Sequence, residues 1–127
     1  MLFEFSPLCG GVPVYQISDK EHLVLCADKY GSKMDYWEAN EHCLSGQAGG
    51  FCDWIIPSIS QLSILHKMRD YCHLSIGDGW YWSSDVFTEN SQWICDIKNG
   101  TVSTSYHDKK LLLIKARIHI NEPLAPY

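Results

Sequence analysis

One stretch in the middle of the chain constrains the fold more than any other. Residues 50–58 read Gly-Phe-Cys-Asp-Trp-Ile-Ile-Pro-Ser, which combines a turn glycine, an aromatic suited to a core and a proline that stops the preceding segment. Ser58 stands three residues before Gln61, the spacing of a capping box at a helix start. Residues 81–84, Tyr-Trp-Ser-Ser, then have the character of an aromatic strand. We therefore expect a turn, a buried Trp54, a capped helix and a strand, in that order.

Two α-helices are predicted from capping and periodicity. The first follows Asp35, which forms a second capping box with Glu38, and it ends at Gly46. The second follows Ser58. The sides expected to be buried carry Tyr36, Ala39 and Cys43 on the first helix, and Leu62, Leu65, Met68 (or the stem of Arg69) and Cys72 on the second. The solvated face of the second helix is expected to carry His66, Lys67, Arg69 and Asp70.

Strand signals fill the start and the second half of the chain. Strands are predicted at residues 12–17, 22–27, 80–85, 92–98 and 101–106. Asn99-Gly100 is a strong hairpin signal, and Pro13 indicates an edge or entry position because it cannot donate to a ladder. In a last strand, Ile114, Ala116, Ile118 and Ile120 are expected to face in, and Lys115, Arg117 and His119 to face out. Two helices followed by antiparallel hairpins indicate an α+β fold in one domain, residues 1–127.

Size and charge limit the function classes. The chain has 127 residues, of which 46% are hydrophobic, a profile of one globular domain. Ten basic residues stand against 15 acidic ones, so the net charge of −5 argues against binding to nucleic acid or to an anionic membrane. The sequence shows no signal peptide and no apolar run of about 20 residues. We therefore expect a cytoplasmic protein.

The cysteines are interpreted in the light of that location. The chain has six of them and no Cys-x-x-Cys pair: Cys9, Cys26, Cys43, Cys52, Cys72 and Cys95. Without an export signal, reduced thiols are expected rather than disulfides. His42-Cys43 and Cys72-His73 could each supply two zinc ligands, but the usual ligand spacing is missing. We expect no metal and no cofactor.

Several of these motifs together resemble a known family. Six motifs follow one another along the chain: Ala39 and Cys43, then Gly50, Asp53, Trp54, Pro57 and Leu62, then Tyr-Trp-Ser-Ser at 81–84, Trp93, Asn99-Gly100 and residues 116–118. In this order they are similar to the C-terminal domain of the collagen-like adhesin (Lcl-type) family, over roughly residues 34–119. The resemblance implies a C-type-lectin-like fold, in which two helices pack on antiparallel sheets and the N- and C-terminal strands are adjacent. Such domains mostly bind other molecules.

The chain departs from that family in ways that bear on function. Ile55 and Gln61 stand where the family usually has arginine and glutamate, and we interpret these as two interacting charges lost together. The collagen-like stalk is absent, so the adhesin role does not transfer with the fold. The calcium-binding motifs of sugar-binding C-type lectins are missing too. Asn121-Glu122-Pro123 has the wrong order, and Ile94 and Cys95 occupy positions that would need oxygen ligands.

Catalytic chemistry has little support in the sequence. Cys72 and His73 are adjacent, so on a helix their side chains point about 100° apart and do not form a nucleophile–base pair. No phosphate-binding glycine loop and no hydrolase or metalloprotease motif occurs. We expect that the protein is not an enzyme.

The surplus of aromatic residues in the second half is the best indication of a binding surface. Trp82 and Trp93 are assigned to the core with Trp54 nearby, and the loop 86–92 is expected to present the surface. The predicted binding residues are Trp80, Asp85, Phe87, Glu89, Asn90 and Tyr106. Aromatic anchors rimmed by polar groups suit a protein interface and also sugar stacking, although such aromatics can equally cover the edge of a core.

The expected function is that of a non-catalytic binding module acting by stoichiometric contact with another protein. A small, acidic recognition domain without targeting signals fits a phage or mobile-element protein that inhibits a host protein. The alternative is a calcium-independent glycan- or receptor-binding tip of a surface or particle protein.

Overall fold

The first helix begins where its capping box predicts. The computed structural model describes residues 10–26, 32–69 and 76–120. In it, α1 (Tyr36–Ser45) follows Asp35, whose side chain accepts a hydrogen bond from the backbone N–H of Glu38 at 2.9 Å, while the Glu38 carboxylate accepts one from the Asp35 N–H. Gly46 ends the helix. Both predicted bounds are confirmed.

The second helix begins in the same way. α2 (Ile59–Met68) follows Ser58, which exchanges backbone and side-chain hydrogen bonds with Gln61. Gln61, one of the two departures from the resembled family, therefore has a use in this cap. The predicted solvated face of α2 needs one correction. His66 is half-buried, and its Nδ1 lies 2.6 Å from the carbonyl oxygen of Ile97. Asp70 and Cys72, predicted at the end of this helix, and Cys9 lie outside the described residues.

The strands form two antiparallel sheets of three strands, so the fold is α+β. One sheet has the order β1-β2-β6, from β1 (Val12–Gln16), β2 (Glu21–Leu25) and β6 (Ala116–Ile120). The other has the order β3-β4-β5, from β3 (Trp80–Thr88), β4 (Ser91–Asp96) and β5 (Thr101–Tyr106). A 3-10 turn, η1 (Ala48–Gly50), lies between the helices in sequence. Among the described residues, β6 therefore pairs with β2 and β1 lies at the far edge, so the first and last described strands share a sheet but are not the adjacent strands that were expected.

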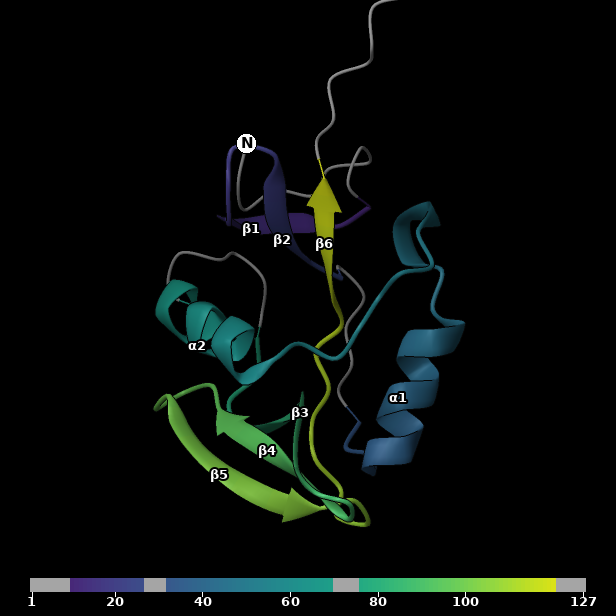
Figure 1. Ribbon diagram of the computed structural model, residues 1–127, viewed down its shortest axis with the longest axis vertical. Coiled ribbons are helices and arrows are strands. Elements are labelled where there is room, and N and C mark those ends of the chain that lie inside the picture. Colours follow the sequence, from purple (N-terminus) through teal and green to yellow (C-terminus); the bar gives the residue numbers. More distant parts are fainter. Residues whose placement is uncertain (1–9, 27–31, 70–75, 121–127) are drawn as a thin grey trace, which may run out of the picture.

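The two sheets are joined by the segment that leads into β6. This segment runs from the β3-β4-β5 sheet to the β1-β2-β6 sheet, with α2 and α1 to either side (Figure 1). On the way, the backbone N–H of Leu112 donates to the Trp80 carbonyl at 3.0 Å, and Trp82 donates to Leu112 at 3.1 Å. Further along, Ile55 and Ala116 exchange two backbone hydrogen bonds of 2.7 and 3.0 Å. The chain thus covers one edge of each sheet with its own backbone.

The β3–β4 connection differs from its prediction. Residues 86–92 were expected to form a loop, but β3 continues to Thr88 and a two-residue turn leads directly into β4 at Ser91. The register of the β3–β4 ladder explains how β3 continues. Trp82 pairs with Ile94 and Val86 with Gln92, so four steps along β3 span two along β4, and β3 bulges between these pairs.

Polar side chains hold this bulge together. The Ser83 hydroxyl donates to the Trp93 carbonyl at 2.5 Å and accepts from the Asp85 N–H at 3.1 Å, and the buried Gln92 amide donates to the Ser83 carbonyl at 3.1 Å. The strand therefore resumes after the bulge instead of ending there.

The β4–β5 hairpin forms at the predicted position. Asp96 pairs with Thr101, so the turn comprises four residues, and Gly100 adopts a φ of 73°. A Cβ at Gly100 would also lie 2.8 Å from the His66 ring. Glycine is therefore required here both by backbone conformation and by space.

The hydrophobic core confirms two of the three tryptophan assignments. Trp54 and Trp82 are buried, and each indole N–H donates to a backbone carbonyl, of Ala48 at 3.0 Å and of Met34 at 2.9 Å. Trp93 was assigned to the core but is half-buried and lies against Phe87. The assignment failed because α2 covers the face of β4 that carries Cys95, and Trp93 lies further along that face.

At several positions of the last strand, the observed exposure is the opposite of the one expected. Lys115 and Arg117 are buried, whereas Ile120 is exposed. The Arg117 guanidinium lies 3.8 Å above the Phe51 ring and donates to both carboxylate oxygens of Asp53, at 2.7 and 3.2 Å. Because the segment around Asp53 packs over this face of β6, the face expected to be solvated is covered.

Candidate binding surface

The six residues predicted to bind do not all lie together. Phe87 and Tyr106 are exposed by 53% and 65% and line one small groove with Thr88, Ser91, Thr104 and Ser105. Asn90 lies with Tyr106 in a neighbouring groove, and Glu89 is exposed beside Asn90 in the β3–β4 turn. Phe87, Asn90 and Tyr106 therefore belong to one surface at the hairpin.

The other two predicted residues have structural contacts. Trp80 is half-buried against the core cluster that contains Trp82 and Ile94. Asp85 accepts a hydrogen bond of 2.8 Å from the backbone N–H of Ile59, the first residue of α2. We therefore leave both out of the candidate surface.

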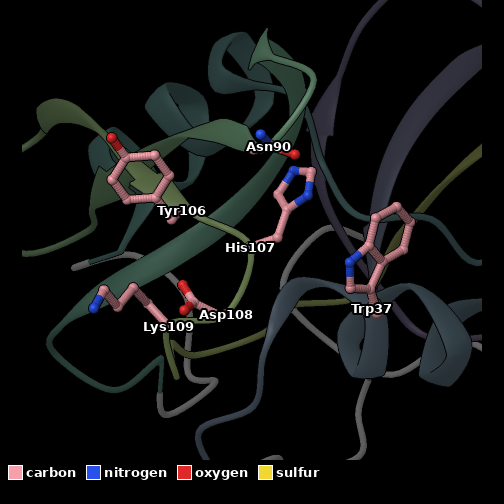
Figure 2. A pocket seen from close by; sticks show the side chains of 6 residues that line it. All are labelled: Trp37, Asn90, Tyr106, His107, Asp108 and Lys109. Carbon is pink, nitrogen blue, oxygen red and sulfur yellow. The ribbon is translucent and has the colours of Figure 1, made fainter.

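The larger groove is built around His107. Its backbone N–H donates to the Asn90 carbonyl at 3.0 Å, and its Nε2 lies 3.2 Å from the Gln92 side-chain oxygen. The ring stacks on Tyr36 with 4.6 Å between centroids and meets the edge of Trp37 at 5.1 Å. The imidazole is thus held on three sides, and Figure 2 shows it between Trp37 and Asn90.

This groove is open and has a volume of about 370 Å³. It is lined by Trp37, Asn90, Tyr106, His107, Asp108 and Lys109. Tyr106 lines both grooves, so they are neighbours. We call the set Trp37, Phe87, Asn90, Tyr106 and His107 the hairpin surface.

Sequence reasoning missed the contributions of α1 and of the segment after β5. Trp37 is 62% exposed, although it directly follows Tyr36, which was correctly assigned to the buried side. One helical step turns a side chain by about 100°, so a tryptophan next to the buried stripe was a signal of an exposed aromatic. His107 had no such signal, because its neighbours come from α1 and β4.

A charged contact ties α1 to the groove. The Lys110 ammonium lies 2.5 Å from the Glu38 carboxylate and 3.6 Å from that of Asp35. The hydrogen bond to Glu38 raises the pKa of Lys110, and the backbone hydrogen bond from Glu38 lowers the pKa of Asp35. The segment 107–110 and the start of α1 are therefore joined by ion pairs as well as by ring contacts.

The described residues offer few groups for other chemistry. Within residues 10–26, 32–69 and 76–120, no three His, Cys, Asp or Glu side chains gather where they could hold a metal ion. Burial raises the pKa of the Cys43 thiol to about 12, so this thiol stays protonated and is a poor nucleophile at neutral pH.

Neither helix in the described residues has the length and the hydrophobicity that a membrane-spanning helix needs.

A scan against protein-family models and a search of the curated proteins found no match to this chain.

Proposed function

We propose that this chain is a non-catalytic binding module of C-type-lectin-like fold, which contacts another protein through the hairpin surface. The observation that carries the proposal is the exposure of three large aromatic side chains, Trp37, Phe87 and Tyr106, around two neighbouring grooves. Aromatic side chains dominate the energetic centres of protein interfaces, because they bury a large area and lose little conformational entropy.

The ring contacts within this surface support the same function. Phe87 meets the Trp93 ring edge-on at 5.0 Å, and Trp37 is fixed by its contacts with Tyr36 and His107. A surface that is ordered before binding loses less entropy on association. Around the aromatics, Asn90, Asp108 and Lys109 supply both charges and an amide, the composition expected of a polar rim.

The narrower form of the proposal is that the module blocks the protein it binds. A phage or mobile-element inhibitor of a host protein would act in a one-to-one complex, without turnover. The partner's activity should therefore fall linearly with added chain and reach its minimum at one equivalent.

A glycan is the second candidate ligand. The exposed Trp37 indole lines the larger groove together with Asn90 and Asp108, and such a combination can stack a sugar ring while accepting and donating hydrogen bonds. This alternative is calcium-independent. A glycan array with calcium chelated separates it from the protein-binding proposal.

The test compares captured partners between variants. The immobilised chain is exposed to lysate together with Phe87→Ala, Trp37→Ala and the control Lys67→Ala, an exposed position on α2. A partner of the hairpin surface should be retained by the control and lost by both aromatic variants. With the purified partner, each aromatic truncation should weaken binding by about 2 kcal/mol or more, roughly 30-fold in Kd.

The contrary result is equally clear. If Lys67→Ala loses the partner while the folded Phe87→Ala and Trp37→Ala variants keep it, the binding surface lies on α2 and the proposal is wrong. Unchanged circular dichroism and thermal midpoints would show that the aromatic variants are folded.

A further inference from the structure

Strand β5 is an edge strand with an uncovered side. It pairs with β4 on one side, from Thr101 opposite Asp96 to Tyr106 opposite Ser91. On the other side, no described residue forms a ladder with it. An edge of this kind presents a row of backbone donors and acceptors to another strand.

The hydrogen-bond pattern identifies the groups that point outward. The His107 N–H donates to the Asn90 carbonyl, which places this pair among the hydrogen-bonded pairs of the antiparallel ladder. Such pairs alternate along a ladder, so Thr101, Ser103 and Ser105 direct their backbone groups toward β4. Val102, Thr104 and Tyr106 therefore direct theirs outward. The Tyr106 carbonyl already accepts from the Lys109 N–H at 3.3 Å and from the Ser105 hydroxyl at 3.2 Å, so three N–H groups and the carbonyls of Val102 and Thr104 are offered to a second strand.

The other sheet edges are protected, and β5 is the exception among the described strands. β1 carries Pro13 and a register shift between Pro13 and Tyr15, two devices that discourage further pairing. The outer side of β3 is bonded to Leu112, and β6 is bonded to Ile55. β5 reads Thr-Val-Ser-Thr-Ser-Tyr, with no charge, no proline and an unbroken register.

We propose that β5 is the dimer interface of this protein, where it pairs antiparallel with β5 of a second copy. The outward groups fit a twofold axis at Thr104, where Thr104 faces the partner's Thr104 and Val102 faces the partner's Tyr106. Threonine pairs and pairs of an aromatic with a β-branched residue are among the favourable cross-strand neighbours. Because the strand is uncharged, no like charges oppose each other in this register, although the whole chain carries −5.

The dimer would have one continuous six-stranded sheet. A twofold axis perpendicular to the sheet leaves the same face of both copies on one side, so both Phe87 side chains would be displayed in the same direction. This inference goes beyond the proposed function, and the two surfaces overlap at Tyr106 and at Thr104, which lines the smaller groove. The two proposals are tested separately, because sedimentation of the chain alone reports the dimer and partner capture reports the hairpin surface. Two hairpin surfaces on one side would allow bivalent binding.

The test uses the property that a residue on a twofold axis meets its own copy. Sedimentation velocity of the full chain should show a species of twice 14.5 kDa that dissociates on dilution. Thr104→Lys and Thr104→Asp should each raise the dimer dissociation constant at least tenfold, because like charges would then face each other. An equimolar mixture should dimerise again, since Lys would face Asp.

Val86→Lys is the matched control. Val86 is exposed on β3, away from the β5 edge, so its charge should leave the dimer unchanged. Hydrogen exchange supplies a second measurement that needs no variant: protection of the Val102, Thr104 and Tyr106 amides should increase with protein concentration.

Each contrary outcome overturns the proposal. These outcomes are a wild-type chain that is monomeric at hundreds of micromolar, a dimer that persists in both folded Thr104 variants, and a mixture that stays monomeric. A dimer whose three outward amides exchange rapidly would place the interface elsewhere. If those amides become protected only when another protein is added, the edge receives a foreign strand and no second copy.

Discussion

Arg117 shows how the environment of one residue can reverse its expected position. Alternation along the last strand predicts that it faces solvent, yet its side chain is 6% exposed, between the Phe51 ring and the Asp53 carboxylate. A guanidinium can be buried in this way because its flat face stacks on an aromatic while its edge donates to a carboxylate. The hydrogen bonds from Arg117 lower the pKa of Asp53.

Replacing Arg117 by methionine should lower the free energy of unfolding by about 1–2 kcal/mol at pH 7, since methionine keeps the apolar stem but loses the charged hydrogen bonds. Because the folded-state pKa of Asp53 is lowered, this contribution is present above about pH 4 and is lost as the pH falls through the lowered value. Urea titrations of both proteins at pH 7 and pH 2.5 should therefore differ at pH 7 and converge at low pH.

The exposed Lys110 provides the control for Arg117. Lys110→Met removes an ion pair whose side chains are 58% and 52% exposed, so it should lower the free energy of unfolding far less than Arg117→Met does. Equal losses in the two variants would contradict the role assigned to the burial of Arg117. An Asp53 pKa that is unchanged in Arg117→Met, measured by carboxyl NMR, would contradict the pairing.

At the scale of elements, α2 depends on a residue from another element. Its first turn has two acceptors, the Ser58 hydroxyl and the Asp85 carboxylate, which reach the backbone N–H groups of Gln61 and Ile59. Asp85 reaches the helix because it lies in the bulge of β3. The bulge thus connects the hairpin that carries Phe87 to the start of α2.

Replacing Asp85 by alanine should cost about 1–2 kcal/mol of folding stability, because the Ile59 N–H loses a charged acceptor at the positive end of the helix. The measurement is chemical unfolding followed by far-ultraviolet circular dichroism. Ser84→Ala, next to it and exposed, should change stability by less than about 0.5 kcal/mol. A stable Asp85→Ala protein with impaired partner binding would restore Asp85 to the binding surface.

At the scale of the whole molecule, the fold divides the cysteines by accessibility. Cys43 and Cys95 are buried in different core clusters, whereas Cys52 is exposed in the segment before Trp54. Burial raises the pKa of the Cys43 and Cys95 thiols. Reaction of these two thiols with an alkylating reagent therefore requires the core to open.

Pulsed alkylation at pH 8 should modify Cys52 within the pulse and leave Cys43 and Cys95 unmodified until denaturant is added. Mass spectrometry of the digested protein reads each site, with denatured protein as the control for intrinsic reactivity. The fully denatured chain should titrate as six thiols. Four or fewer in freshly purified protein would show disulfides, and rapid modification of Cys43 in native protein would contradict its burial.

Local signals in the sequence determined the secondary structure well. Both capping boxes place their helices correctly, because the hydrogen bonds that start a helix join residues only three apart. Asn99-Gly100 marks a hairpin for a similar reason, since the turn needs a residue that tolerates positive φ. The burial of Trp54 and Trp82 followed from hydrophobicity. The choice of Phe87, Asn90 and Tyr106 as candidate surface residues followed from the surplus of aromatics beside a polar turn.

Tertiary structure alone decided which of those residues meet. The continuation of β3 past its bulge depends on Ser83 and Gln92 bonding across strands, and the burial of Arg117 depends on Asp53, far away in the chain. The candidate surface required α1 to bring Trp37 to His107, which follows β5. Periodicity reports which side of its own element a residue occupies. What covers that side is set by the packing of segments distant in sequence, and no local pattern encodes it.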